Sequence, residues 1–266
     1  MAEFVMKDLV EKAGLADEFQ IDSAATCRDE IGNPVYPPAR RKLAEHGISC
    51  EGHAARQLTA QDYEEYDLLI AADEIYTTYI YEGDFHPIRT LPGMAERTIV
   101  VNGFSKSYAM TGWRIGYVAG PRVEICAMTS FQSHATSNAN SIAQYAAMKA
   151  LQGDPQCVTD MVAQFEARRN AMVEKINSIP GLSCMKPQGA FYIMLNITGV
   201  MGKTYNGRVI DSSQTFAELL LADKHVAVVP GNAFEAEGFC RLSYAVAMES
   251  CMEGLRRIEE FVSELK

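Results

Sequence analysis

Apolar residues recur at helical spacing in several parts of the chain. The first stripe predicts a helix from Phe4 to Ala13 that closes near Gly14. Pro37-Pro38 begins a second helix, which ends at Gly47. The stretch from Thr59 to Asp62 is typical of a capping box for a short third helix. Further stripes predict helices within residues 121–151, 158–176, 216–221 and 251–262.

Runs of apolar residues between these helices predict strands. The run from Thr98 to Val101 ends shortly before Lys106, and a second run from Trp113 to Val118 carries Arg114. Asp67 to Ala72 forms a candidate buried strand. Other strands are expected within residues 19–24, 189–194 and 226–229. The alternation of strands and helices predicts an α/β fold, a layered sheet with flanking helices, followed by a smaller α+β lobe.

Composition narrows the possible functions. The chain has 266 residues, of which 48% are hydrophobic, and this is enough for one large or two smaller cores. A net charge of −10 argues against a nucleic-acid partner, and no run approaches the ~20 apolar residues of a membrane helix. The 7 cysteines are widely spaced, contain no Cys-x-x-Cys pair and fit reduced thiols in the cytoplasm. The 5 histidines lack metal-ligand spacing, so we expect no structural metal.

The stretch from Gly103 to Gly116 combines the features of a cofactor site. It reads Gly-Phe-Ser-Lys-Ser-Tyr-Ala-Met-Thr-Gly-Trp-Arg-Ile-Gly and places Lys106 near the end of a predicted strand, where open α/β sheets bind ligands. A lysine attacks an aldehyde only when its amine is deprotonated, a state that burial and a neighbouring cation favour. Arg114 is such a cation, and its planar fork also suits a phosphate. The alternative is a solvated lysine on a loop, the more common situation for a single lysine.

The whole string from Gly103 to Gly116 resembles the lysine signature of the class I and II pyridoxal-phosphate-dependent aminotransferases. The resemblance begins at Ala72-Asp73-Glu74-Ile75-Tyr76 and continues to the C-terminus. It implies that Lys106 is the Schiff-base lysine for pyridoxal 5′-phosphate. It also implies that Arg114 binds the phosphate and that Ser105 assists there.

The same resemblance assigns three further residues. Asp73 corresponds to the acid that keeps the pyridine nitrogen protonated, and Tyr76 to the phenol against the cofactor's 3′ oxygen. Cys240-Arg241-Leu242-Ser243-Tyr244 resembles the segment that binds the substrate α-carboxylate, with Arg241 as its bidentate ligand. From the residues alone, an Asp-Glu pair after a strand is more often a loop or a helix cap, and an arginine at a strand end is usually a surface residue. The Pro-Gly-x-x-Phe sequence from Pro230 to Phe234 also matches the family.

The first quarter of the chain shows a second resemblance, to the low-molecular-weight protein tyrosine phosphatases. It rests on Met1-Ala2-Glu3-Phe4, Asp22-Ser23-Ala24-Ala25-Thr26, Gly32-Asn33-Pro34, His53-Ala54-Ala55-Arg56-Gln57 and Tyr66-Asp67-Leu68-Leu69-Ile70. That family works through a Cys-x5-Arg loop whose thiolate attacks phosphorus. Cys27 does not fit this loop, because Asn33 rather than an arginine stands six positions later. We expect residues 1–72 to be a scaffold segment without the catalytic loop and without phosphatase chemistry.

Together these patterns predict three parts: a phosphatase-like segment over residues 1–72, a partial cofactor-binding domain over 73–150 and a small domain over 151–266. The resemblance implies pyridoxal-phosphate-dependent transfer of an amino group between an amino acid and a 2-oxo acid, at a site completed across a homodimer. It covers the C-terminal half of a family member, so we expect transamination to be impaired while cofactor capture is retained. The alternatives are a non-catalytic chimera or fragment and, third, a phosphatase.

Overall fold

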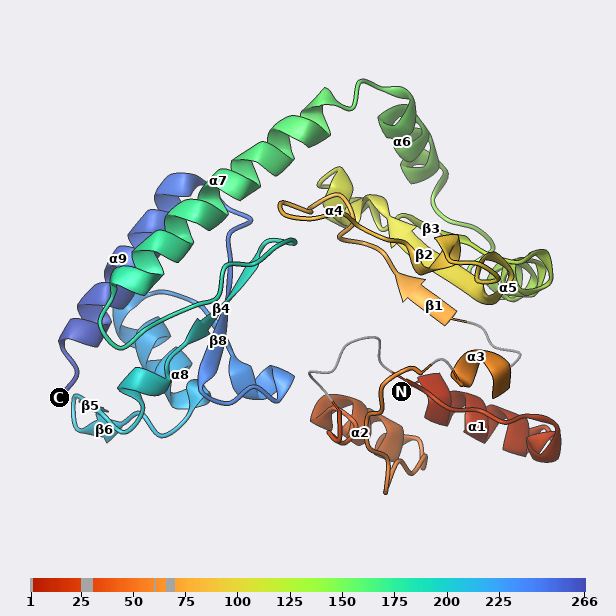
Figure 1. Ribbon diagram of the computed structural model, residues 1–266, viewed down its shortest axis with the longest axis horizontal. Coiled ribbons are helices and arrows are strands. Elements are labelled where there is room, and N and C mark those ends of the chain that lie inside the picture. Colours follow the sequence, from red (N-terminus) through yellow and green to blue (C-terminus); the bar gives the residue numbers. More distant parts are fainter. Residues whose placement is uncertain (1, 25–30, 60, 66–69) are drawn as a thin grey trace. The chain divides into compact units, whose positions relative to one another are not determined.

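The structure, a computed structural model, describes residues 2–24, 31–59, 61–65 and 70–266 (Figure 1). The chain divides into two compact units, Met1–Leu68 and Leu69–Lys266. The fold is mixed α/β, with sheets and flanking helices, as the sequence predicted. Within the described ranges, no helix combines the length and the apolar character needed to cross a membrane.

The N-terminal unit consists of helices joined by irregular segments. Its helices are α1 (Ala2–Lys12), α2 (Pro37–Glu45) and α3 (Asp62–Glu65). The Asp62 carboxylate accepts a 2.7 Å hydrogen bond from the backbone N–H of Thr59, as expected of the predicted capping box. Apolar side chains of α1, α2 and the connecting segments form a small core: Phe4, Val35, Leu43 and Cys50.

The predictions for this unit hold for the helices and fail for the strand. Gly14 and Gly47 each adopt a left-handed φ of +71° just after α1 and α2, which confirms the predicted helix ends. The expected strand over residues 19–24 was wrong, because these residues form no strand. Phe19, which should have anchored its buried face, is 49% exposed. The apolar alternation therefore has no core to face.

The sheet that leads to Lys106 has the order β1–β2–β3. Its strands are β1 (Ile70–Asp73), β2 (Thr98–Gly103) and β3 (Gly116–Ala119), with β1 parallel to β2 and β2 antiparallel to β3. The predicted strand from Thr98 to Val101 is confirmed as part of β2. Of the strand predicted over 67–72, residues 67–69 lie outside the described part of the chain. Ala71 is exposed rather than buried.

The segment between β2 and β3 differs from the prediction. β2 runs directly into the one-turn helix α4 (Phe104–Ser107), which carries Lys106. A single 3-10 turn, Thr111–Trp113, precedes Arg114, which adopts a left-handed conformation with φ +50° and ψ +48°. Since a strand requires extended backbone at every residue, β3 begins only at Gly116. The expectation that Arg114 lies within a strand was therefore wrong.

Three helices follow: α5 (Arg122–Ala135), α6 (Ser141–Gln152) and α7 (Gln156–Ser178). They confirm the predicted helices and the turn at Ser137-Asn138, where Ser137 has a φ of +64°. α5 buries none of its side chains, whereas α7 buries Phe165, Met172 and Ile176 on its predicted stripe. In Figure 1 the C-terminal half of α7 lies alongside α9 (Met248–Ser263), and the two helices are in contact.

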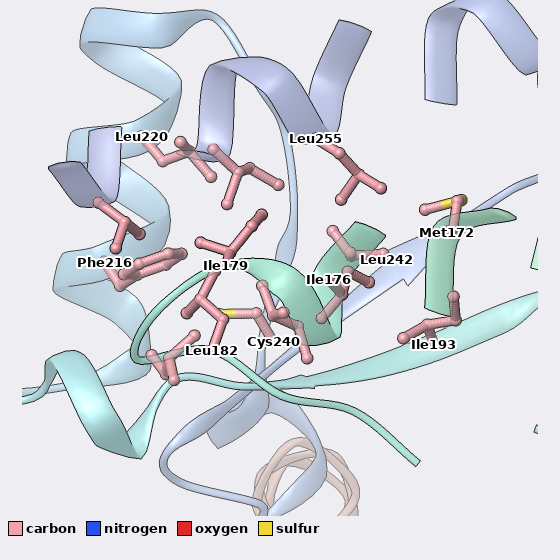
Figure 2. Packing of buried hydrophobic residues seen from close by; sticks show 14 of the residues in the cluster. Met172, Ile176, Ile179, Leu182, Ile193, Phe216, Leu220, Cys240, Leu242 and Leu255 are labelled. Atoms are coloured by element: carbon pink, nitrogen blue, oxygen red, sulfur yellow. The ribbon is translucent and has the colours of Figure 1, made fainter. Parts of the chain in front are cut away.

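The C-terminal lobe is built on a second, antiparallel sheet with the order β4–β8–β7. Its elements are β4 (Tyr192–Asn196), β7 (Val229–Pro230), β8 (Phe239–Ser243), the hairpin β5 (Thr204–Tyr205) and β6 (Arg208–Val209), α8 (Ser213–Lys224) and α9. Figure 2 shows the core between these elements and α7, which includes Met172, Ile176, Ile193, Phe216, Leu220, Leu242 and Leu255. The lobe has the α+β character predicted, although the strand expected over 226–229 is reduced to β7.

A segment after β1 pairs with the segment that leads into β4. The Tyr81 N–H donates a 2.8 Å hydrogen bond to the Gln188 carbonyl, and the Ala190 N–H donates one of 2.8 Å to the Tyr79 carbonyl. Gly189 lies between these bonds, where a Cβ would come within 2.6 Å of the Tyr79 oxygen. This close pairing places the residues that follow β1 next to those that begin β4.

Candidate active site

Lys106 is held at the end of β2 by contacts to its own helical turn. The Tyr79 hydroxyl donates a 2.7 Å hydrogen bond to the Lys106 carbonyl. The neighbouring Ser107 hydroxyl lies 2.8 Å from that of Thr78. Thr78 and Tyr79 both lie in the segment after β1, and this segment also carries Tyr76, the predicted cofactor phenol. The helical turn α4 is therefore held against that segment.

The Lys106 side chain lies among aromatic rings. Its Nζ is 5.7 Å from the centroid of the Tyr76 ring and 5.6 Å from that of Phe191. Within the part of the chain that the structure describes, Nζ makes no hydrogen bond or ion pair. Aromatic faces attract a cation but offer no hydrogen-bond acceptor in a fixed position. The amine is therefore positioned and still available to a ligand.

Tyr76 connects this amine to the second sheet. Its ring packs edge-on against Phe191 and Tyr192, and its hydroxyl lies 3.1 Å from the Tyr192 hydroxyl. Burial, together with the hydrogen bond to Tyr192, raises the pKa of Tyr76 well above its ordinary value. The phenol consequently stays protonated at neutral pH and remains a hydrogen-bond donor.

Arg241 lies on β8, and its guanidinium contacts two aromatic rings. Its Cζ is 4.5 Å from the centroid of the Tyr192 ring and 4.5 Å from that of Phe234. Among the described residues, the guanidinium makes no hydrogen bond or ion pair. Contacts with rings do not use the N–H donors of the guanidinium, so its N–H edge stays open. That edge is the part of an arginine that binds a carboxylate bidentately.

The structure thus brings three of the six predicted site residues into one chain of contacts, from Lys106 through Tyr76 and Tyr192 to Arg241. Asp73 ends β1, just before Tyr76, and its exposed carboxylate accepts a 3.2 Å hydrogen bond from the Ile75 N–H.

The two predicted phosphate ligands are less closely tied to this chain of contacts. Arg114 is exposed and donates a 3.0 Å hydrogen bond to the Thr111 carbonyl. Ser105 lies beside Lys106 in α4 and is half-buried. The roles given to all six residues stay predictions.

Sequence reasoning missed three aromatic residues of this site, Phe191, Tyr192 and Phe234. Phe191 and Tyr192 are adjacent in a predicted strand, and Phe234 closes the Pro-Gly-x-x-Phe sequence. Two consecutive aromatic residues were a usable signal of an aromatic cluster, and in the structure both rings pack against Tyr76. It was not sufficient, because the partners of these rings are far away in the sequence.

A Cys-x5-Arg spacing occurs in the chain at residues other than Cys27. Cys50 stands six positions before Arg56 within the phosphatase-like segment. The structure gives this pair other roles, since Cys50 is buried in the small core and Arg56 bonds Asp22 and Asp62 at 2.8 and 2.7 Å. Cys27 lies outside the described residues. Cys251 has the same spacing but belongs to α9, where its side chain is buried.

The remaining expectations concern metals. In the described ranges, no group of His, Cys, Asp and Glu side chains has the geometry to hold a metal ion.

Two family models match the chain. The one described as aminotransferase class I and II matches residues 57–258, and the one described as low molecular weight phosphotyrosine protein phosphatase matches residues 1–87. Both matches agree with the two resemblances drawn from the sequence.

Individual relatives point in the same direction. The aspartate aminotransferase of Streptomyces avermitilis is 43% identical over 204 residues, which cover 76% of this chain and 50% of that protein. The aspartate/prephenate aminotransferase of Nitrosomonas europaea is 40% identical over 201 residues, or 74% of this chain and 51% of that protein. The solved structure of the aspartate aminotransferase from Rhizobium meliloti is 40% identical with a TM-score of 0.72, covering 79% of this chain and 55% of that one. The chain spans about half the length of the relatives it matches.

Proposed function

This chain belongs to the class I and II aminotransferase family, and we propose that it binds pyridoxal 5′-phosphate through Lys106 and transfers an amino group between an amino acid and a 2-oxo acid. The observation that carries the proposal is that two cationic side chains, Lys106 and Arg241, lie at the two ends of one chain of contacts. Both lie against aromatic rings, and both keep their polar ends without a partner in the described residues.

The donor set fits this cofactor. An aldehyde needs an amine without a competing polar partner, which Lys106 offers. A phenolic oxygen accepts from a protonated phenol such as Tyr76, and a protonated pyridine nitrogen pairs with a carboxylate such as that of Asp73. A phosphate is bound by guanidinium and hydroxyl groups. Ser105 supplies a hydroxyl directly before Lys106 in the sequence, and Arg114 supplies a guanidinium eight residues after it.

When bound, pyridoxal phosphate supplies an electron-accepting ring that allows the Cα–H bond of an amino acid to break. Lys106 Nζ holds the cofactor and then moves the proton that leaves the substrate α-carbon. Asp73 holds the proton on the pyridine nitrogen, and the Tyr76 phenol donates a hydrogen bond to the 3′ oxygen. Arg241 orients the substrate through its α-carboxylate, which keeps the breaking bond within reach of Lys106.

Membership of this family also leads us to propose the domain roles, the substrates, the cellular location and the oligomeric state. Residues 73–150 form the cofactor-binding part and residues 151–266 the small domain, while residues 1–72 are a phosphatase-like scaffold joined to them as a chimera. The substrates are an amino acid and a 2-oxo acid, and aspartate is the first to test because aspartate aminotransferases are among the relatives. We place the protein in the cytoplasm as a homodimer.

The test is covalent capture of the cofactor. The chain is incubated with pyridoxal phosphate, reduced with borohydride and digested, and the pyridoxyl adduct is located by mass spectrometry. We expect the adduct on Lys106 and its loss in Lys106→Ala, whereas Lys149→Ala, which changes an exposed lysine of α6, retains it. An adduct spread over surface lysines, or none at all, contradicts the proposal.

A second assay separates binding from turnover. Amino transfer from aspartate to 2-oxoglutarate is measured with the same three proteins. Transfer that disappears in Lys106→Ala supports the full proposal. Adduct formation on Lys106 without any transfer supports the non-catalytic alternative instead.

A further inference from the structure

Tyr192 contacts both ends of the candidate site. Its hydroxyl lies 3.1 Å from that of Tyr76, and its ring lies 4.5 Å from the Arg241 guanidinium carbon. No other residue in the described ranges contacts both Tyr76 and Arg241 in this way. Tyr192 is thus shared by the residue assigned to the cofactor and the residue assigned to the substrate.

The sheet register fixes Tyr192 over Arg241. In the antiparallel pair of β4 and β8, Tyr192 is opposite Ser243 and Met194 is opposite Arg241. Residues two apart on a strand share a face, so Tyr192 and Arg241 are diagonal neighbours on one face of the sheet. The stacking of the ring on the guanidinium is therefore set by the backbone hydrogen bonds of two strands.

The contact with Tyr76 is fixed from the other side. Tyr76 follows β1, and the Tyr79 carbonyl, three residues on, accepts the 2.8 Å hydrogen bond from the Ala190 N–H just before Tyr192. The two rings meet edge-on, with centroids 6.0 Å apart at 76°. This arrangement lets the two hydroxyls meet while the Tyr192 face stays on Arg241.

We propose that Tyr192 is a positioning residue that couples the two ends of the site, its hydroxyl holding the Tyr76 phenol and its ring holding the Arg241 guanidinium. The inference rests on the proposed function, because it takes Tyr76 as the cofactor phenol and Arg241 as the carboxylate ligand. Together with burial, the hydrogen bond between the two hydroxyls raises the pKa of Tyr76, so in the chain without cofactor it favours the protonated phenol. The Tyr192 and Phe234 rings, each 4.5 Å from the Arg241 Cζ, restrict the movement of the guanidinium and so hold its N–H edge ready for a carboxylate.

Two substitutions separate the hydroxyl from the ring. Tyr192→Phe removes the contact with Tyr76 and keeps the ring on Arg241, whereas Tyr192→Leu removes both. Tyr145→Phe is the matched control, since Tyr145 is 69% exposed on α6. Phe234→Leu removes the second ring beside the Arg241 guanidinium and leaves the contact between the Tyr76 and Tyr192 hydroxyls intact.

The first readout uses the chain without cofactor. The ¹³Cζ signal of Tyr76, identified by its absence in Tyr76→Phe, is followed as the pH is raised. Lys106, Asp73 and Arg241 also act on this phenol, and they are unchanged in the variants. In Tyr192→Phe we expect more Tyr76 to be ionised at a given alkaline pH than in the unaltered chain, and no change in Tyr145→Phe. Equal titration in all three proteins overturns the proposal, whether or not Lys106 binds the cofactor.

The second readout is the affinity for glutarate, a dicarboxylate that has neither an amine nor a ketone. We expect its Kd to rise about two- to fivefold in Tyr192→Leu and in Phe234→Leu, and to stay the same in Tyr192→Phe. An equal loss in Tyr192→Phe and Tyr192→Leu overturns the division between ring and hydroxyl. Failure of the unaltered chain to bind glutarate counts against Arg241 as the carboxylate ligand, and so against the proposed function.

Discussion

The Arg169 guanidinium donates a 2.9 Å hydrogen bond to the carbonyl oxygen of Pro187. The Arg169 side chain is fully buried, and its Cζ lies 4.7 Å from the centroid of the Tyr81 ring. It also contacts the carboxylates of Glu82 and Glu166 at 3.1 and 3.0 Å, and its Nε–H donates a 3.1 Å hydrogen bond to the Asn170 side chain. One cation of α7 therefore holds both segments that meet beside the candidate site.

Replacing this cation is expected to destabilise the fold. Arg169→Ala leaves the Pro187 carbonyl without its donor and a cavity on Tyr81 in place of a fully buried side chain, and we expect the free energy of unfolding to fall by about 3–5 kcal/mol. Arg208→Ala is the control, because Arg208 forms an exposed ion pair with Glu218 that contributes about 0–1 kcal/mol. Urea unfolding of both variants measures the difference, and similar losses would show that Arg169 has no special role.

Tyr79 is predicted to stabilise the position of Lys106. It is 1% exposed, and its hydroxyl donates to the Lys106 carbonyl at 2.7 Å. Tyr79→Phe keeps the packing against Phe165 and Phe191 and removes one buried donor, so we expect a loss of about 1–2 kcal/mol in urea unfolding. Tyr145→Phe on the exposed face of α6 should change stability by less than about 0.5 kcal/mol. If Tyr79→Phe changes stability no more than this control, the hydrogen bond is not important.

The sequence predicts a contact in this molecule well when the two residues are close along the chain, and poorly when they are far apart along it. Lys106 and the end of β2 are close in sequence, so one motif and one apolar run placed them correctly. The contact between Tyr76 and Tyr192 spans 116 residues, and no local pattern predicts which of the chain's tyrosines meet. Arg114 was misplaced for a different reason, because its left-handed backbone follows from the turn before it and not from the β propensity of its neighbours.

Burial was the other source of error. Phe19 belongs to an alternating segment that predicts a strand, and Ala71 to an apolar run that predicts a buried strand, but both residues are exposed. A run of apolar residues shows what a segment is able to bury and not whether another layer covers it. The long stripe of α7 was predicted correctly because the C-terminal lobe packs a complete core against it, as Figure 2 shows.

Gly189 is predicted to be intolerant of a side chain. A Cβ at this position would lie 2.6 Å from the Tyr79 carbonyl oxygen, a backbone atom that cannot turn away. Gly189→Ala should therefore separate the segments after β1 and before β4, and we expect a loss of about 1–3 kcal/mol.

The matched control for this substitution is Gly254→Ala. Gly254 lies inside α9, and nothing stands within 4 Å of a Cβ built there. We expect a gain of about 0.5–1 kcal/mol, because alanine favours the helix. Urea midpoints for the two variants should move in opposite directions, and a neutral Gly189→Ala would mean that the two segments are not closely paired.

Acid is predicted to destabilise the N-terminal unit through Arg56. The hydrogen bond from Arg56 holds the pKa of Asp62 well below its usual range, with further help from Thr59. Burial alone would raise the pKa of Asp22, but the Ser23 N–H and Arg56 outweigh it and lower this pKa as well. A carboxyl whose folded pKa is depressed contributes stability that is complete above its unfolded pKa, about 4, and is lost as the pH falls toward the folded value. We therefore expect this unit to lose stability as the pH drops below about 4.

Arg56→Gln should weaken that pH dependence, because the two carboxyls then regain pKa values closer to those of the unfolded chain. The variant is expected to be less stable than the unaltered chain at neutral pH and to approach it in acid. Arg40→Gln, which changes an exposed residue of α2, should retain the original pH dependence. Urea titrations followed through the amide NMR signals of α2 give the stability of this unit at each pH. If the free energy of unfolding changes with pH in the same way in Arg56→Gln and in the unaltered chain, then Arg56 does not control the pKa values of the two carboxyls.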